Sequence, residues 1–354
     1  MNSKYKVIYH MPFPGTLSAN RTIYNGYKNA FLDLGHEFIT LTSEDDLTKI
    51  LESSNPDIFI TNAHYYFQKF IDYENLNEHR KKGLKVFTNI SYWNSPINKI
   101  RINEAPGLKD DKKTVDLIKS GTLGDFFLST CEQDDHRMEG FKENTGYDFY
   151  TVPLAADRLA LNFKFEEKYK ADISFIGTNL PQKRAYFKEY LFPLGEKYDL
   201  KLYGQDWTLE DRTRGFIQKI GQYFNINELK NIRKPTLKIE DEGLIYYSST
   251  ISVNIHEDYQ RRFGGDCNER TFKIPFCEGF EITDNVSCIK RYFKEDEEII
   301  IAQNKNDWFD KIEYFLKNPE KRLAIIKKGK KRVEQEHTYH NRVESILKIY
   351  EKNS

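Results

Sequence analysis

Apolar runs and helix-like segments alternate along this chain, and the alternation occurs twice. In the first half the apolar runs include KVIYHM at 6–11 and DIFITN at 57–62, separated by segments with apolar residues at helical spacing. The order restarts with DISFIGT at 172–178 and DLKLYG at 199–204. Strand and helix in this order are typical of a parallel sheet covered by helices on both faces. The sequence therefore predicts an α/β protein with two doubly wound, Rossmann-like domains.

The length of the chain and a break in the pattern predict where the domains meet. A chain of 354 residues is long enough for two domains of about 150–200 residues each. The segment at 161–171, LNFKFEEKYKA, is charged and lacks strong periodicity, as linkers often do. We expect a first domain at 1–157, a second at 158–336, and a final helix at 337–354 that packs back toward the first domain.

Composition excludes several classes of protein. The 54 Lys and Arg balance the 54 Asp and Glu, so no global positive field would recruit nucleic acid. No apolar run approaches the roughly 20 residues of a membrane span, and the first residues lack a signal-peptide pattern. The four cysteines form no CxxC pair, which favours free thiols in a reducing compartment. We expect a cytoplasmic protein, at most peripherally associated with the inner face of the membrane.

The stretch at 252–285 concentrates polar side chains beside a predicted helix start. Two short apolar strands enclose a loop that carries Asn268, Glu269, Arg270 and Thr271. A helix start offers free N–H groups and a positive dipole end, both of which suit a phosphate. An arginine fork can add bidentate contacts to phosphate oxygens. The stretch therefore predicts a phosphate site, with Arg270 as its main side chain.

The strand ends of the first half predict a second wall of a ligand cleft. Parallel sheets bind ligands at the carboxyl ends of their strands. His64 follows the third apolar strand, Tyr92 the fourth, and Glu132 and Asp135 the fifth. Aromatic faces and polar groups together suit a sugar, although each residue taken alone is also compatible with an ordinary loop position.

Several segments of the second half resemble one family of enzymes. DISFIGTNLPQKR at 172–184, LKLYGQDW at 200–207, NERTFKIPFCEGFEITDN at 268–285 and EHTYHNRVESIL at 336–347 occur in a characteristic order. They resemble the C-terminal, nucleotide-sugar-binding domain of the CgeB-like (spore maturation protein) branch of GT-B glycosyltransferases. The resemblance covers about half of the chain. It implies a GT-B fold with an acceptor-binding first domain and a donor-binding second domain.

The resemblance also implies an activity and a set of donor-binding residues. The protein would transfer a sugar from a nucleotide-diphosphate sugar to a hydroxyl of a glycan, glycolipid or glycoprotein. It would need neither a metal nor any cofactor besides the donor substrate, and the sequence has no Asp-x-Asp at the end of an apolar strand. The residues expected at the donor are Gly15, Lys183, Arg184, Tyr203, Gly204, His256, Asn268, Glu269, Arg270 and Thr271.

The chain departs from the family pattern at the acidic pair that usually lies near the donor. Lys273 and Gly265 stand where glutamates are common in the wider fold, so Glu269, Glu278 or the backbone would have to hold the ribose. How the donor's sugar and ribose are held therefore stays open at this point.

The stereochemistry of transfer is also open. His64, Glu132 and Asp135 are the candidate catalytic groups, because an inverting enzyme needs a base in the acceptor domain. A retaining enzyme needs no such base, and His64 resembles a histidine that some retaining members place near the donor sugar, so retention is slightly favoured. A sugar-nucleotide epimerase or hydrolase on the same scaffold is the alternative, and a two-lobed solute-binding protein is a third. The oligomeric state is not predicted.

Overall fold

A computed structural model describes residues 4–14, 19–95, 107–224, 226–230 and 232–353. The first half forms a six-stranded parallel sheet in the order β2-β1-β3-β4-β5-β6. Its strands are β1 (Lys6–His10), β2 (Glu37–Leu41), β3 (Ile58–Asn62), β4 (Lys85–Asn89), β5 (Phe126–Ser129) and β6 (Phe149–Thr151). The doubly wound sheet expected for this half is confirmed.

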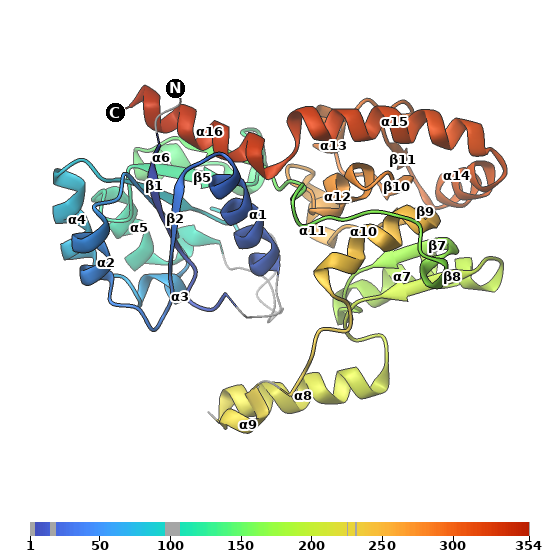
Figure 1. The fold of residues 1–354 in the computed structure, drawn as a ribbon, viewed down its shortest axis with the longest axis horizontal. Coiled ribbons are helices and arrows are strands. Elements are labelled where there is room, and N and C mark those ends of the chain that lie inside the picture. Colours follow the sequence, from blue (N-terminus) through green and yellow to red (C-terminus); the bar gives the residue numbers. More distant parts are fainter. Residues whose placement is uncertain (1–3, 15–18, 96–106, 225, 231, 354) are drawn as a thin grey trace.

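Helices cover this first sheet on both faces (Figure 1). They are α1 (Ala19–Asp33), α2 (Leu47–Ser54), α3 (Tyr65–Gln68), α4 (Tyr73–Lys81), α5 (Lys112–Lys119) and α6 (Phe141–Thr145). Local sequence explains several of their ends. Asp46 and Asp72 accept hydrogen bonds from the first turns of α2 and α4, and Gly35 follows α1 with a φ of 87° that glycine adopts without strain.

One helix expected in this half is shorter than its pattern indicates. The sequence pattern predicts a helical segment from Cys131 to about Asn144, but this segment holds only a 3₁₀ turn at His136–Met138 and the short α6. Gly140 separates the two with a φ of 82°, a left-handed conformation that ends a helix.

The second half forms a five-stranded parallel sheet in the order β11-β10-β9-β7-β8. Its strands are β7 (Ala171–Ile176), β8 (Leu200–Tyr203), β9 (Ser249–Asn254), β10 (Glu281–Asp284) and β11 (Ile300–Ala302). Its helices are α7 (Arg184–Tyr190), α10 (Ile239–Ser248), α11 (Asp258–Phe263), α12 (Arg270–Phe276), α13 (Ile289–Tyr292), α14 (Lys305–Lys317) and α15 (Pro319–Glu336).

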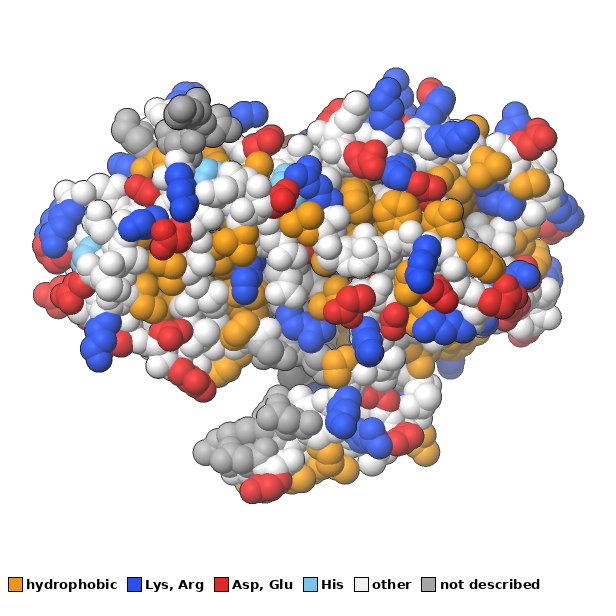
Figure 2. All heavy atoms as spheres, viewed as in Figure 1, with side chains coloured by type: hydrophobic (Ala, Val, Ile, Leu, Met, Phe, Trp, Pro, Cys, Tyr) orange, Lys and Arg blue, Asp and Glu red, His pale blue; other side chains and the backbone are white. Residues whose placement is uncertain are grey.

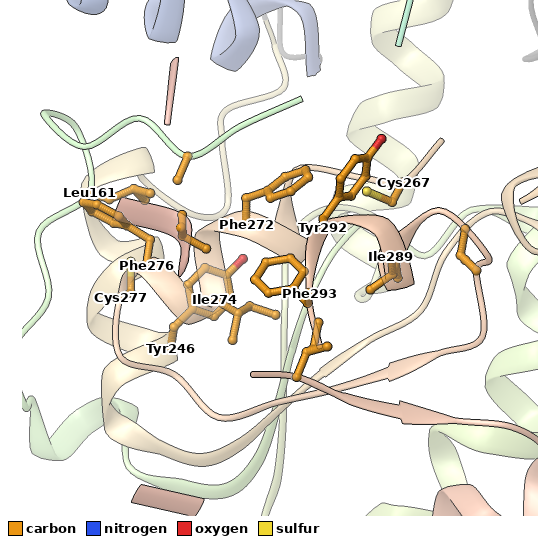
Figure 3. Packing of buried hydrophobic residues seen from close by; sticks show 14 of the residues in the cluster. Leu161, Tyr246, Cys267, Phe272, Ile274, Phe276, Cys277, Ile289, Tyr292 and Phe293 are labelled. Atoms are coloured by element: carbon orange, nitrogen blue, oxygen red, sulfur yellow. The ribbon is translucent and has the colours of Figure 1, made fainter. Parts of the chain in front are cut away.

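An aromatic core fixes α12 beneath the cleft. Figure 3 shows Phe272 of α12 beside Tyr292 and Phe293, and its ring also lies 5.1 Å from that of His337. All four side chains are buried. Because close-packed interiors resist displacement, this cluster holds the N-terminal end of α12 in a defined position.

Two helical segments of the second half do not pack on the second sheet. The segment between β8 and α10 forms a helical hairpin, α8 (Leu209–Tyr223) and α9 (Asn227–Lys230), that extends away from the body of the protein (Figure 1). The last helix, α16 (Tyr339–Lys352), crosses back and packs on α1 of the first sheet. A Cβ at Gly26 of α1 would lie 2.2 Å from the Tyr339 ring, so glycine permits this close approach.

No described helix combines the length and the apolar composition required to cross a bilayer.

Candidate functional site

Two adjoining cavities lie where the two sheets face each other. One, of about 560 Å³, is lined mostly by residues after β1, β3, β4 and β5 of the first sheet. The other, of about 630 Å³, is lined mostly by the second half, at the ends of β7 and β8 and the start of α12. Asn20, Tyr92 and Tyr259 line both cavities. Both sheets thus present the carboxyl ends of their strands to one cleft, where open α/β sheets bind ligands.

Arg270, the first residue of α12, is held at the ends of two strands. Its Nη1 donates to the carbonyl of Ile176 and its Nη2 to that of Ile255, both at 2.9 Å, and its Nε donates to Asn254 Oδ1 at 3.0 Å. An arginine has five N–H donors, so these bonds among the described residues use three of them. The guanidinium lines the larger cavity with the remaining donors and a fixed orientation.

Two glycines permit the close contacts around Arg270. A Cβ at Gly177 would lie 3.0 Å from Arg270 Nη1, and one at Gly204 would lie 2.5 Å from the Gly177 carbonyl oxygen. Gly204 also has a φ of 112°, which L side chains rarely adopt. The loops after β7 and β8 can therefore approach the arginine as backbone, and both glycines line the cavity.

Lys183 supplies a second cation to the same cavity. Its Nζ lies 2.7 Å from Glu257 Oε1 and donates to the Ile255 carbonyl at 3.2 Å. Burial lowers the pKa of Lys183 to about 8, and the Glu257 carboxylate opposes that shift. The side chain is nine-tenths buried, so its charge acts in a poorly hydrated place.

Lys273 lies between two carboxylates on the cavity wall. Its Nζ is 3.3 Å from Glu242 of α10 and 3.2 Å from Glu269. These carboxylates raise the pKa of Lys273 despite its burial. Glu269 also accepts from the Tyr339 and Thr22 hydroxyls, both at 2.6 Å. Residue 273 is not the usual glutamate, but two glutamates, Glu242 and Glu269, lie beside it.

The structure describes nine of the ten residues expected at the donor, and they fall into three groups. The described residues Lys183, Gly204, Asn268, Glu269 and Arg270 line the larger cavity. His256 and Thr271 are fully buried behind it, and Tyr203 and Arg184 lie beside it and line neither cavity. Gly15 lies outside the described residues.

The buried pair behind the cavity supports Arg270. His256 Nδ1 lies 2.6 Å from Asp284, and its Nε2 lies 3.2 Å from Thr271 Oγ1. Thr271 Oγ1 in turn accepts from Asn254 Nδ2 at 3.2 Å, and Asn254 holds Arg270. His256 and Thr271 therefore position the arginine and have no surface to offer a ligand directly.

His64 caps a helix and does not line either cavity. Its Nδ1 accepts from the backbone N–H of Tyr66 at 3.2 Å at the start of α3, and burial lowers the pKa of its ring. His10, the last residue of β1, lines the smaller cavity instead. Its Nδ1 lies 3.0 Å from Thr61 Oγ1, its Nε2 has no hydrogen-bond partner among the described residues, and burial lowers its pKa to about 4.

Sequence reasoning overlooked His10, although the signal was available. His10 is a polar residue at the carboxyl end of an apolar strand, and His64 was predicted from the same kind of position just beyond a strand. Glu242 was also overlooked, and no local pattern could have found it, because it meets Lys273 from a different helix.

Glu132 and Asp135 both take part in contacts between the two domains. Glu132 accepts from the Tyr292 hydroxyl and pairs with Arg291, both in or beside α13. Asp135 bonds the buried Arg137, whose Nη2 also bonds Asp266 of the second half at 2.5 Å. In this arrangement neither carboxylate is free to take a proton from an acceptor, contrary to the expectation for them.

The same contact explains why residue 265 is glycine. A Cβ there would lie 1.9 Å from the Asp135 carboxylate, and the Gly265 carbonyl accepts from the Glu132 N–H at 2.8 Å. A glutamate at this position would collide with the first domain. Glu278, the other expected substitute, pairs with Lys330 and does not line the cavity.

One group of described residues has the donor atoms of a metal site: Cys131, Asp135 and Asp266. Both of its carboxylates bond Arg137, whose guanidinium already supplies the positive charge between them. A divalent cation there would have to displace or oppose that charge, so the group does not suit a metal.

Part of the chain is similar to a known family of proteins. Residues 184–348 match the model of the glycosyl transferase-like family. The chain is 24% identical over 196 residues to spore protein CgeB of Bacillus subtilis (strain 168). That match covers 51% of this chain, and the chain spans about half the length, 55%, of this curated relative.

Solved structures share the whole architecture. Sucrose-phosphate synthase from Thermosynechococcus elongatus matches with a TM-score of 0.61 and 11% identity over 99% of each chain. The Anabaena protein HepE, solved with UDP and glucose, matches with a TM-score of 0.60 and 8% identity over 98% of this chain and 100% of that one. A glycosyltransferase from Rickettsia africae ESF-5 matches with a TM-score of 0.60 and 14% identity, over 99% and 100%. Residues 184–348 are therefore similar to the glycosyl transferase-like family and to CgeB, and the two sheets of the chain form the GT-B fold.

Proposed function

We propose that this protein transfers a sugar from a nucleotide-diphosphate sugar to a hydroxyl of a glycan, glycolipid or glycoprotein, without a metal ion. The observation that carries the proposal is the cavity of about 630 Å³ lined by Arg270, Lys183 and Lys273 at the ends of parallel strands. The family match and the GT-B neighbours support it, since HepE was solved with UDP-glucose as well as with UDP and glucose.

The cations supply what a departing diphosphate requires. Cleavage of the bond between sugar and phosphate adds negative charge to the leaving group, and fixed cations stabilise that charge without reorganising. Arg270 offers a planar fork suited to phosphate oxygens, and Lys183 offers a point charge. Their positions are set before the donor arrives, because both side chains already bond the Ile255 carbonyl.

Glu242 is our choice for the carboxylate that holds the donor ribose. It lines the cavity, and among the described residues its one ion-pair and hydrogen-bond partner is Lys273. Glu269 also lines the cavity, but two hydroxyls occupy its oxygens. A carboxylate can accept hydrogen bonds from both hydroxyls of a ribose.

The acceptor would occupy the smaller cavity. Its wall includes Tyr9, His10, Asn62, Ser91 and Thr130, which are neutral hydrogen-bonding groups suited to hydroxyls. His10 is neutral near pH 7 because of its lowered pKa, so its ring can accept a hydrogen bond from an acceptor hydroxyl. A retaining course remains our preference, because both expected carboxylate bases are committed to the contact between domains.

A thermal-shift screen tests the proposal. The screen would use UDP, GDP, dTDP and CMP, each with and without chelator. One of these nucleotides should raise the melting temperature, and chelator should not reduce that shift. If UDP binds, 2′-deoxy-UDP should bind more weakly to the wild type, and Glu242→Gln should lose that difference. Absence of any shift, or a shift that chelator abolishes, contradicts the proposal. Hydrolysis or epimerisation of the donor at full rate with no acceptor present favours the alternative enzyme.

A further inference from the structure

The α8–α9 hairpin carries the most exposed large apolar side chains of the described chain. Leu209, Phe216, Tyr223 and Phe224 are 80%, 65%, 84% and 66% exposed. Folded proteins normally expose such side chains singly, so a group of four on one projecting element requires an explanation. Figure 2 shows hydrophobic and basic side chains together on this projection.

The exposed side chains of α8 form one stripe. Leu209, Arg212, Phe216, Lys219 and Tyr223 follow each other at intervals of three or four residues and are all exposed. At 3.6 residues per turn they fall within about 80° of the helix circumference. We call these five residues the α8 stripe. Apolar and basic side chains therefore alternate along a single face that points away from the protein.

The hairpin is positively charged in a chain that is neutral overall. From 209 to 238 the sequence holds seven Lys or Arg and three Asp or Glu, whereas the whole chain has a formal net charge of zero. One of the three acids, Asp211, is buried against Arg233 at the base of the hairpin. The stripe itself contains two cations and no acid.

We propose that the α8–α9 hairpin docks this protein on an anionic lipid bilayer, with the α8 stripe facing the headgroups. Aromatic side chains favour the boundary between headgroups and acyl chains, and long basic side chains place their charges among the phosphates. A polybasic surface is attracted to anionic lipid by about 1 kcal/mol, or roughly fivefold in affinity, for each Lys or Arg near the membrane.

The stripe suits a bilayer better than a second copy of the chain. In a twofold interface the same patch meets itself, so Arg212 and Lys219 would approach their own counterparts. Like charges brought together in this way oppose association, and the stripe carries no acid to offset them. Lipid phosphates offer the opposite charge along the whole stripe.

Docking through the hairpin would hold the cleft near the membrane. Arg233 pins the base of the hairpin to Asp206 and Asp211 at 2.8 and 2.7 Å. The return segment then lines the larger cavity through Pro235, Thr236 and Leu237. The mouth of the donor cavity and the docking surface therefore belong to one connected segment.

Vesicle sedimentation of the full chain tests the proposal. The protein should sediment with phosphatidylcholine vesicles that contain about 30 mol% phosphatidylglycerol, but not with phosphatidylcholine alone, and salt should weaken binding. Arg212→Gln/Lys219→Gln should lower the partition constant about 25-fold. Phe216→Ser/Tyr223→Ser should lower it at least tenfold, because it removes the apolar anchors.

Leu323→Ser is the matched control, since Leu323 is an exposed apolar residue (56%) on α15, and it should bind like the wild type. All variants should keep their melting temperature and their response to the nucleotide that the wild type binds, which separates a failure here from a failure of the proposed function. Binding that is equal on neutral vesicles, or unchanged by both stripe variants, overturns the proposal. So does a concentration-dependent dimer in sedimentation velocity that Phe216→Ser/Tyr223→Ser abolishes.

Discussion

The two walls of the cleft differ in charge although both sheets have the same parallel design. The wall from the second half carries Lys183, Arg270 and Lys273, and each of them already has partners. The wall from the first half is lined by neutral side chains such as Tyr9, His10 and Asn62. A buried charge is costly unless it is paired, whereas neutral polar groups are less costly to desolvate. The difference supports the proposed arrangement, in which a charged donor lies against one wall and a hydroxyl-bearing acceptor against the other.

The walls also differ in the support behind them. Arg270 rests on Asn254, which bonds Thr271 and Glu281, and Thr271 rests on His256. Among the described residues His10 has one hydrogen-bond partner, Thr61, and its other ring nitrogen has none. A site backed by several bonded layers is preorganised for one ligand geometry. The wall from the first half fixes the geometry of its side chains less strongly. In the proposed function it can therefore accommodate acceptors of more varied shape than the other wall can accommodate donors.

The largest effect should come from removing the best-supported charge. Arg270→Ala should weaken binding of the preferred nucleotide diphosphate by roughly 100-fold or more, because hydrogen bonds to charged groups contribute about 1.5–3 kcal/mol each and two donors of this cavity-lining arginine remain for a ligand. Titration calorimetry of the variant and the wild type measures this change. Arg270→Lys should fall between them, since it keeps the charge but loses the fork.

Arg184→Ala is the matched control for Arg270→Ala. Arg184 follows Lys183 but lines neither cavity, and within the described part of the chain it donates only to the Asn179 carbonyl, at 3.5 Å. Its removal should leave affinity within about twofold, as for other surface changes. Equal losses in the two arginine variants would mean that general positive charge, and not the fixed fork of Arg270, holds the donor.

Neutral His10 in the wall from the first half should make the free energy of unfolding depend on pH in the acid range. The pKa of His10 is about 4 in the folded protein and 6.5 when unfolded, so between these values the unfolded state binds more protons. Stability is therefore lost as pH falls through this window, by about 2 kcal/mol between pH 7 and pH 5. Urea unfolding of His10→Gln at both pH values should show a loss that is smaller by this amount.

His64→Gln provides the comparison for His10→Gln. The pKa of His64 is also lowered by burial, but its ring is only half-buried, so its contribution should be smaller. If His10→Gln loses as much stability on acidification as the wild type, then the His10 ring is charged or solvated at pH 5, and the description of that wall as neutral is wrong.

The fold could be predicted because its signals are local and repeated. Strand and helix periodicity, the caps at Asp46 and Asp72, and glycine at 35 each depend on a few neighbouring residues. The helix expected after Cys131 was overestimated for a tertiary reason, because the residues that follow it bend to place Asp135 and Arg137 against Asp266. Local propensity gives way where a contact between domains requires another path.

The candidate site was predictable only where a motif places it. Arg270 and Asn268 lie in a recognisable segment and do line the cavity. His256 and Thr271 lie close to them in sequence, but the strand and the helix turn their side chains inward. Glu242 belongs to a helix with no motif and reaches the site through its contact with Lys273. Proximity in sequence to the motif therefore predicted two residues that do not line the cavity, His256 and Thr271, and missed one that does, Glu242.

The smallest effect, and the most diagnostic, concerns Lys183 at alkaline pH. Its pKa of about 8 means that it loses its charge above pH 8, so nucleotide affinity should fall about tenfold from pH 7 to pH 9. Lys183→Arg should bind nearly equally at both pH values, because arginine stays protonated.

Stability should respond to pH in the opposite direction. The unfolded lysine binds more protons than the folded one between pH 8 and 10.5, so the contribution of Lys183 to the free energy of unfolding rises with pH in that window. Calorimetric binding and urea unfolding measured together would thus separate a loss of ligand contact from a loss of fold. Affinity and stability that fell together above pH 8, and did so equally in Lys183→Arg, would contradict a role for Lys183 in the charged wall.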